Sequence, residues 1–72
     1  MKRTFTYIIE QDEDGFYTAD VQELPGCHTQ AKSLDELKNR VLEAIKLFLE
    51  EKGNSIHGSR FIGVQQIEAS IE

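Results

Sequence analysis

Residues 23–27, with the sequence Glu-Leu-Pro-Gly-Cys, constrain the fold more than any other part of this 72-residue chain. They contain the only proline and the only cysteine, and they lie between two short segments of extended character. Pro25 fixes its own φ and Gly26 tolerates a positive φ, so the segment favours a tight chain reversal. Two roles are open for it. It is either the turn that organises the fold or the position of a thiol nucleophile, Cys27.

Alternating apolar and polar residues predict three β-strands separated by two reversals. Residues 4–10 and 16–21 are rich in β-branched and aromatic side chains, and the Asp-Gly step that ends at Gly15 favours a hairpin loop between them. Residues 27–32 can return as a third strand. The positions that mark the two reversals are Gly15, Leu24, Pro25, Gly26 and Cys27.

The segment that follows carries the signals of one amphipathic helix. Ser33 and Glu36 have the spacing of a capping box, in which each side chain accepts a hydrogen bond from the backbone amide of the other residue. Gly53 stands where a helix C-cap is expected. One face of the helix is predicted to be apolar, with Leu34, Leu37, Val41, Ala44, Ile45 and Phe48 at spacings of three and four residues.

A fourth strand is predicted at residues 60–67, which gives the order β-β-β-α-β in a single α+β domain over residues 1–72. If the helix crosses one face of the sheet, the fourth strand runs parallel to the first and can lie beside it through a right-handed connection. The expected structure has two layers, with one helix on a four-stranded mixed sheet. Because so short a chain has a small core and this sheet has uncovered edges, we expect a homo-oligomer, either a dimer or a tetramer.

Acidic residues are concentrated in the first half of the chain. The net charge is −5, and residues 4–31 contain six carboxylates without any lysine or arginine. Such a surface repels nucleic acid and attracts a basic protein, although acidic loops also simply keep small proteins soluble. The predicted partner-binding residues are Glu10, Asp12, Glu13, Asp14 and Asp20.

The sequence gives little support to catalysis or metal binding. Cys27 and His28 are neighbours on a predicted strand and therefore point to opposite faces, so His28 is poorly placed to deprotonate the thiol. One cysteine and two separated histidines, His28 and His57, match no zinc-site spacing. We expect a structural Cys27, no catalytic residue, no metal and no cofactor, with a thiol enzyme that uses Cys27 as an alternative.

The chain also shows no sign of export or of membrane insertion. No apolar run has the length of a signal peptide core or of a membrane span. A single cysteine cannot form an internal disulfide. We therefore expect a cytoplasmic protein without a membrane partner.

Taken in order, the acidic hairpin at residues 12–17, the reversal at residues 23–27 and the Ser-capped helix start at residues 33–37 resemble the HicB antitoxin family. The resemblance covers nearly the whole chain. It implies a partial ribonuclease H-like fold without nuclease activity. It also implies a non-catalytic antitoxin of a type II toxin-antitoxin system, which binds and blocks a small basic HicA-type toxin that cleaves mRNA.

Many members of the HicB family continue into a DNA-binding module, whereas this chain ends just after its predicted fourth strand. We therefore expect a short member that does not bind nucleic acid directly. The resemblance leaves one further alternative open, namely an orphan homo-oligomeric HicB-like module that has no toxin.

Overall fold

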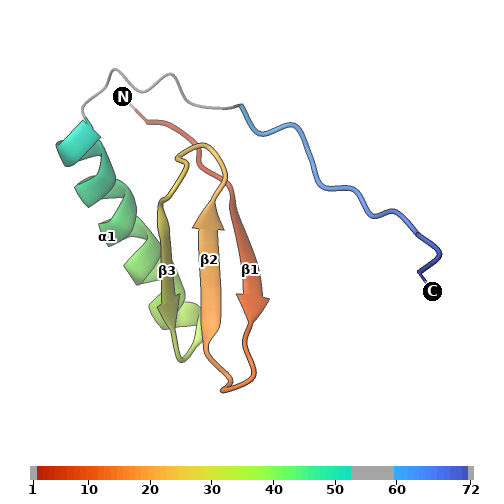
Figure 1. The fold of residues 1–72 in the computed structure, drawn as a ribbon. Helices are drawn as coiled ribbons and strands as arrows, with labels where there is room; N and C mark the ends of the chain where they lie inside the picture. The colour runs from red at the N-terminus through yellow and green to blue at the C-terminus, as the bar shows by residue number, and fades with distance from the viewer. Residues whose placement is uncertain (1, 53–59, 72) are drawn as a thin grey trace.

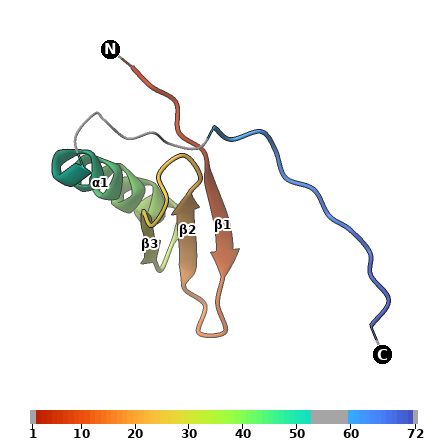
Figure 2. The same cartoon turned by 45° about the horizontal axis from the view of Figure 1, so that its top comes forward.

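The computed structural model describes residues 2–52 and 60–71. Three strands are followed by one helix, namely β1 (Tyr7–Gln11), β2 (Tyr17–Val21), β3 (His28–Ala31) and α1 (Leu34–Lys52). The strands form one antiparallel sheet in the order β1-β2-β3, and α1 lies across one face of it (Figures 1 and 2). The predicted α+β class and the order of the first four elements are confirmed.

The first reversal joins β1 to β2 through an acidic turn. One carboxylate oxygen of Asp12 accepts hydrogen bonds from the backbone amides of Asp14, at 3.0 Å, and Phe16, at 2.9 Å. Gly15 has a φ of 88°, in the region that glycine adopts most readily. The turn therefore fixes a register in which Ile9 lies opposite Ala19.

The second reversal joins β2 to β3 and is the predicted turn at residues 23–27. The amide of Cys27 donates to the carbonyl of Leu24 at 2.9 Å, and the amide of Val21 donates to the carbonyl of Cys27 at 2.9 Å. Gly26 has a φ of 87°. Leu24 is fully buried, so this turn closes the sheet and also contributes to the core.

The start of α1 is stabilised by a capping arrangement that differs from the prediction in one bond. Ser33 Oγ accepts a hydrogen bond from the amide of Glu36 at 3.1 Å, as predicted. Glu36 Oε1, however, accepts from the amide of Lys32 at 3.2 Å rather than from the amide of Ser33. The glutamate thus reaches one residue further back and ties the helix to the end of β3.

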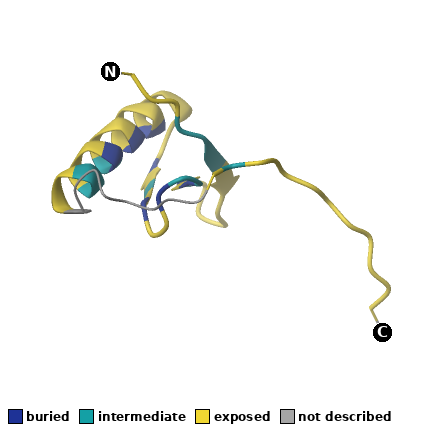
Figure 3. Ribbon diagram, turned by 90° about the horizontal axis from the view of Figure 1, so that it is seen from above, coloured by how far each residue is buried: buried dark blue, intermediate teal, exposed yellow. Residues whose placement is uncertain are grey.

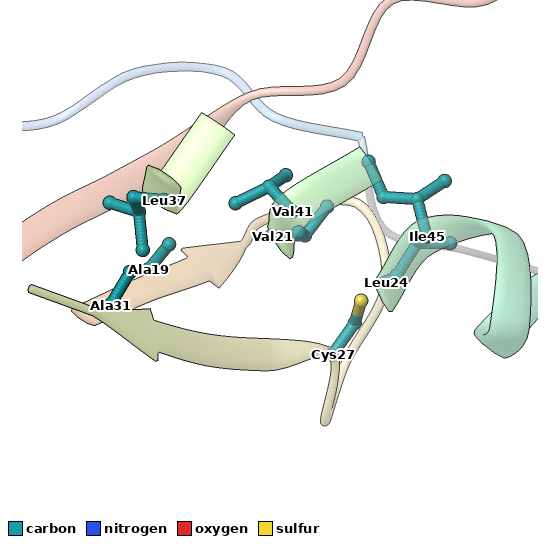
Figure 4. Packing of buried hydrophobic residues seen from close by; sticks show 8 residues of the cluster. All are labelled: Ala19, Val21, Leu24, Cys27, Ala31, Leu37, Val41 and Ile45. Atoms are coloured by element: carbon teal, nitrogen blue, oxygen red, sulfur yellow. The ribbon is translucent and has the colours of Figure 1, made fainter. Parts of the chain in front are cut away.

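The core lies between α1 and the two strands that the helix contacts, β2 and β3. Figure 4 shows apolar side chains from both layers meeting there, and Figure 3 shows that burial is concentrated on the inner surfaces of α1 and the sheet. The backbone of β1 lies farther from α1 than that of β2 and β3, and no strand of the described residues pairs with its outer edge. The buried residues are Ala19, Val21, Leu24, Cys27, Ala31, Leu37, Val41 and Ile45.

Residues 60–71 form neither a helix nor a strand. The segment starts near the N-terminal end of β1 and then diverges from the sheet (Figures 1 and 2). The strand predicted at residues 60–67 is therefore not confirmed, and neither are the four-stranded mixed sheet and the ribonuclease H-like fold. A strand needs a hydrogen-bonding partner as well as a suitable pattern, and this segment has none in the described chain. Gly53 and His57 lie outside the described residues.

Candidate functional site

Two of the five predicted partner-binding carboxylates lie on the sheet face opposite α1. Glu10 lies opposite Thr18, and Asp20 lies opposite Ile8. Side chains alternate between faces along a strand, so both carboxylates point away from the face on which Ala19 is buried against the helix. Both are exposed. The open face of the sheet therefore carries negative charge at two separate positions.

The other three carboxylates form the tip of the β1–β2 hairpin, next to Glu10. Asp12 is bound to the backbone of its own turn, so its carboxylate has a structural role that the charge pattern did not reveal. Glu13 and Asp14 are exposed, and within residues 2–52 and 60–71 nothing forms a hydrogen bond or an ion pair with their carboxylates. Glu10, Glu13 and Asp14 thus form an acidic end of the sheet that is open to a partner, while Asp20 lies further along.

A shallow hollow on the same open face brings polar side chains from β2 and β3 together. It has a volume of about 390 Å³, and its lining includes Thr18, Asp20, His28 and Gln30. His28 lies opposite Asp20 in a pair that is not linked by backbone hydrogen bonds, since those link Val21 to Cys27 one step along. Side chains approach most closely in such pairs. The sequence pattern brings His28 to attention as a possible base for Cys27 or a possible metal ligand, but it does not indicate this position beside a carboxylate, because strand pairing alone creates it.

The structure places Cys27 in the core. Its side chain is 5% exposed, and burial raises the pKa of the thiol, which lowers the fraction of reactive thiolate at neutral pH. His28 is exposed and belongs to the other face of the sheet. Cys27 therefore has the position of a core side chain, and the geometry does not favour a Cys-His catalytic pair.

In the described part of the chain, no group of three or more histidine, cysteine, aspartate or glutamate side chains is arranged to hold a metal ion. Among the same residues, no helix has both the length and the apolar character needed to cross a membrane.

The family model that describes the HicB-like antitoxin of bacterial toxin-antitoxin systems matches residues 5–71, which include all three strands, both turns and the helix. This chain belongs to the HicB-like antitoxin family. Membership supports an antitoxin role, a toxin as the general kind of partner and a function that is not enzymatic.

Relatives of this HicB-like chain come from both archaea and bacteria. A UPF0150 protein of Archaeoglobus fulgidus is 61% identical over 64 residues, which cover 89% of this chain and 91% of the relative. A UPF0150 protein of Synechocystis is 41% identical over 66 residues, covering 92% and 94%. A third, from Thermotoga maritima, is 38% identical over 69 residues, covering 94% and 92%. This HicB-like chain is therefore similar to each of these relatives over almost the full length of both proteins.

Proposed function

We propose that this HicB-like chain is the antitoxin of a type II toxin-antitoxin system and that it binds and blocks a small basic HicA-type toxin that cleaves mRNA. The observation that carries the proposal is the family match over residues 5–71. The exposed acidic end of the sheet supports it, because a toxin that binds RNA needs a basic surface to hold phosphates. The proposed complex forms in the cytoplasm, where mRNA is found.

The contact surface proposed for the toxin combines the acidic end with the open face of the sheet. Glu13 and Asp14 attract the toxin over a distance, while Glu10 and Asp20 meet it at close range. Exposed ion pairs contribute only up to about 1 kcal/mol each, so the charges mainly set the association rate and the orientation. Most of the affinity then has to come from desolvated contacts across the open face.

The antitoxin acts by occupying the toxin's active site, and this chain needs no catalytic group for that. The proposal also assigns no direct contact with nucleic acid to this chain, because the acidic half of the sheet repels phosphate. Operator binding, where it occurs, is then supplied by another protein.

Co-expression tests the proposal. The proposal expects a small basic protein to be encoded beside this chain. That protein should arrest growth when expressed alone, and the two proteins should co-purify and restore growth when expressed together. A matched control is the same experiment with a chain whose core is disrupted by Leu37→Asp, which buries a charge and should abolish rescue. The proposal is wrong if the neighbouring protein is harmless, or if it is toxic and this chain neither binds nor neutralises it.

A second candidate is the orphan homo-oligomeric HicB-like module without a toxin. It is favoured by one specific observation, namely that Ile62, Val64 and Ile67 expose apolar side chains in a chain whose described residues leave one edge of β1 unpaired. In that case the isolated chain should assemble with itself, and co-expression should recover no basic partner.

A further inference from the structure

The outer edge of β1 carries backbone groups that are available to another strand. The amide of Gln22 donates to the carbonyl of Thr6 at 2.8 Å, and the register places Ile8 and Glu10 in the same kind of hydrogen-bonded pair with β2. The residues between them, Tyr7 and Ile9, therefore direct their N–H and C=O groups outward. No strand of the described chain pairs with this edge.

The side chains along this edge are apolar on the helix side and incompletely covered. Tyr7 lies opposite Val21 and Ile9 lies opposite Ala19, so both share the face on which those residues are buried. The backbone of α1 lies close to β2 and β3 but not to β1. Ile9 is consequently 46% exposed at the border of the core. A further strand whose inward side chains were apolar would extend the core over this border.

Residues 60–67 have the composition of such a strand. In the middle of the segment, Ile62 and Val64 alternate with Gly63 and Gln65, so these two apolar side chains share one side of an extended chain, while Phe61 and Ile67 lie on the other side. Ile62 is 81% exposed, Val64 68% and Ile67 93%. Exposure of three branched apolar side chains in one segment is unfavourable in water and marks an interaction site.

Charged residues at the two ends of β1 and of residues 60–67 indicate whether the segment would pair with β1 in a parallel or an antiparallel direction. Lys2 and Arg3 precede β1, whereas Glu10 and Asp12 lie at its far end; the segment begins with Arg60 and is followed by Glu68. A parallel arrangement would bring basic residues together at one end and acidic residues together at the other. An antiparallel arrangement would pair opposite charges at both ends, which is the favourable case.

Whether the segment pairs with β1 in a parallel or an antiparallel direction decides whether it belongs to the same chain or to another molecule. Within one chain the segment starts near the N-terminal end of β1 and then leads away from the sheet (Figures 1 and 2). From that starting point it could lie beside β1 only by running from the N-terminal to the C-terminal end of the strand. Pairing with β1 of its own chain would therefore be parallel, with the unfavourable charge arrangement. An antiparallel partner has to come from another molecule.

We propose that residues 60–67 of one copy add as an antiparallel strand to the free edge of β1 in a second copy, with Ile62 opposite Ile9 and Val64 opposite Tyr7. Both apolar side chains then lie on the helix side, while Gly63 and Gln65 lie on the open face. The same register places Glu68 opposite Arg3 and Arg60 opposite Gln11, next to Glu10 and Asp12. Reciprocal exchange of the segments gives a closed, two-fold symmetric dimer. This self-association is a property in addition to the proposed toxin binding, and it requires no toxin.

Engineered cysteines test the register and the origin of the strand on the isolated chain. In the double variant Gln11→Cys/Arg60→Cys, the proposed dimer brings the two positions directly opposite each other, within the Cα separation that a disulfide spans. Mild oxidation should give a covalent dimer on a non-reducing gel. Thr4→Cys/Arg60→Cys probes the parallel arrangement within one chain and should give no internally cross-linked monomer. All three positions are exposed, so these variants should fold.

Wild-type protein, whose Cys27 is buried, and the single variants Gln11→Cys and Arg60→Cys are the controls and should give little covalent dimer. Removal of residues 60–72 gives an independent readout, since light scattering should then report the mass of a monomer for the truncated chain and the mass of a dimer for the full-length chain. An internal cross-link between positions 4 and 60 would overturn the proposal. So would a full-length chain that is monomeric, or a truncated chain that keeps the mass of the full-length protein.

Discussion

The backbone amide of Thr6 donates a hydrogen bond to Oε1 of Glu23 at 2.8 Å and so connects the start of β1 to the turn at residues 23–27. The two residues are 17 positions apart, and the bond is partly buried. Next to it, the amide of Gln22 donates to the carbonyl of Thr6 at 2.8 Å. Together the two bonds hold the entry to the sheet against the turn that closes it.

Replacement of Glu23 by alanine should therefore destabilise the fold. The Thr6 amide would lose a charged acceptor, and the free energy of unfolding should fall by about 1–2 kcal/mol. Glu23→Gln should lose less, because its amide oxygen can still accept the bond. Urea denaturation measures the difference. Glu13→Ala is the matched control, as its exposed carboxylate makes no bond in the described structure; equal losses for positions 13 and 23 would contradict this role.

Gly26→Ala should also destabilise the protein, and for a backbone reason. Gly26 has a φ of 87°, and an added Cβ would meet no atom within 4 Å, so the expected cost of about 1 kcal/mol is conformational strain rather than a clash. Gly63 has equally open space without a positive φ, which makes Gly63→Ala the control. Thermal unfolding of both variants checks this. A stable Gly26→Ala protein would mean that the turn is not held in this conformation.

The buried thiol of Cys27 should make stability depend on alkaline pH. Burial raises the thiol pKa in the folded chain above its ordinary value of about 8.5, so the unfolded chain loses this proton first as pH rises. The contribution is constant below the unfolded pKa and declines as pH rises through and beyond it. Unfolding of wild type and Cys27→Ala, compared between pH 7 and pH 10, should show a steeper loss in the wild type. If the stability of wild type and of Cys27→Ala declined equally with pH, the thiol would be exposed to water in the folded chain, contrary to this prediction.

The local features of this chain were predictable because their causes lie within a few residues. The Pro25-Gly26 reversal, the Asp-Gly hairpin that ends at Gly15 and the Ser33 cap are each specified by backbone preferences and short-range hydrogen bonds. All are present where the sequence indicated. The one local error concerns Glu36, which bonds the amide of Lys32 instead of Ser33, a shift of a single residue.

Features that depend on long-range pairing were not predictable in the same way. No pattern signals the bond between Thr6 and Glu23, or the position of His28 beside Asp20, since both arise only when strands meet. The strand predicted at residues 60–67 shows the same principle. Its alternation is suitable for a sheet, but alternation does not say which edge, or which molecule, provides the partner.

The association rate between this chain and its toxin tests the proposed role of the acidic surface most directly. The variant Glu13→Gln/Asp14→Asn/Asp20→Asn removes three exposed charges and leaves Asp12 to hold the turn. Glu43→Gln/Glu50→Gln/Glu51→Gln removes the same charge from exposed positions on α1. At low salt the first variant should bind roughly tenfold more slowly than wild type, with a weaker salt dependence, while the α1 variant changes little. Equal association rates for all three proteins would contradict the account.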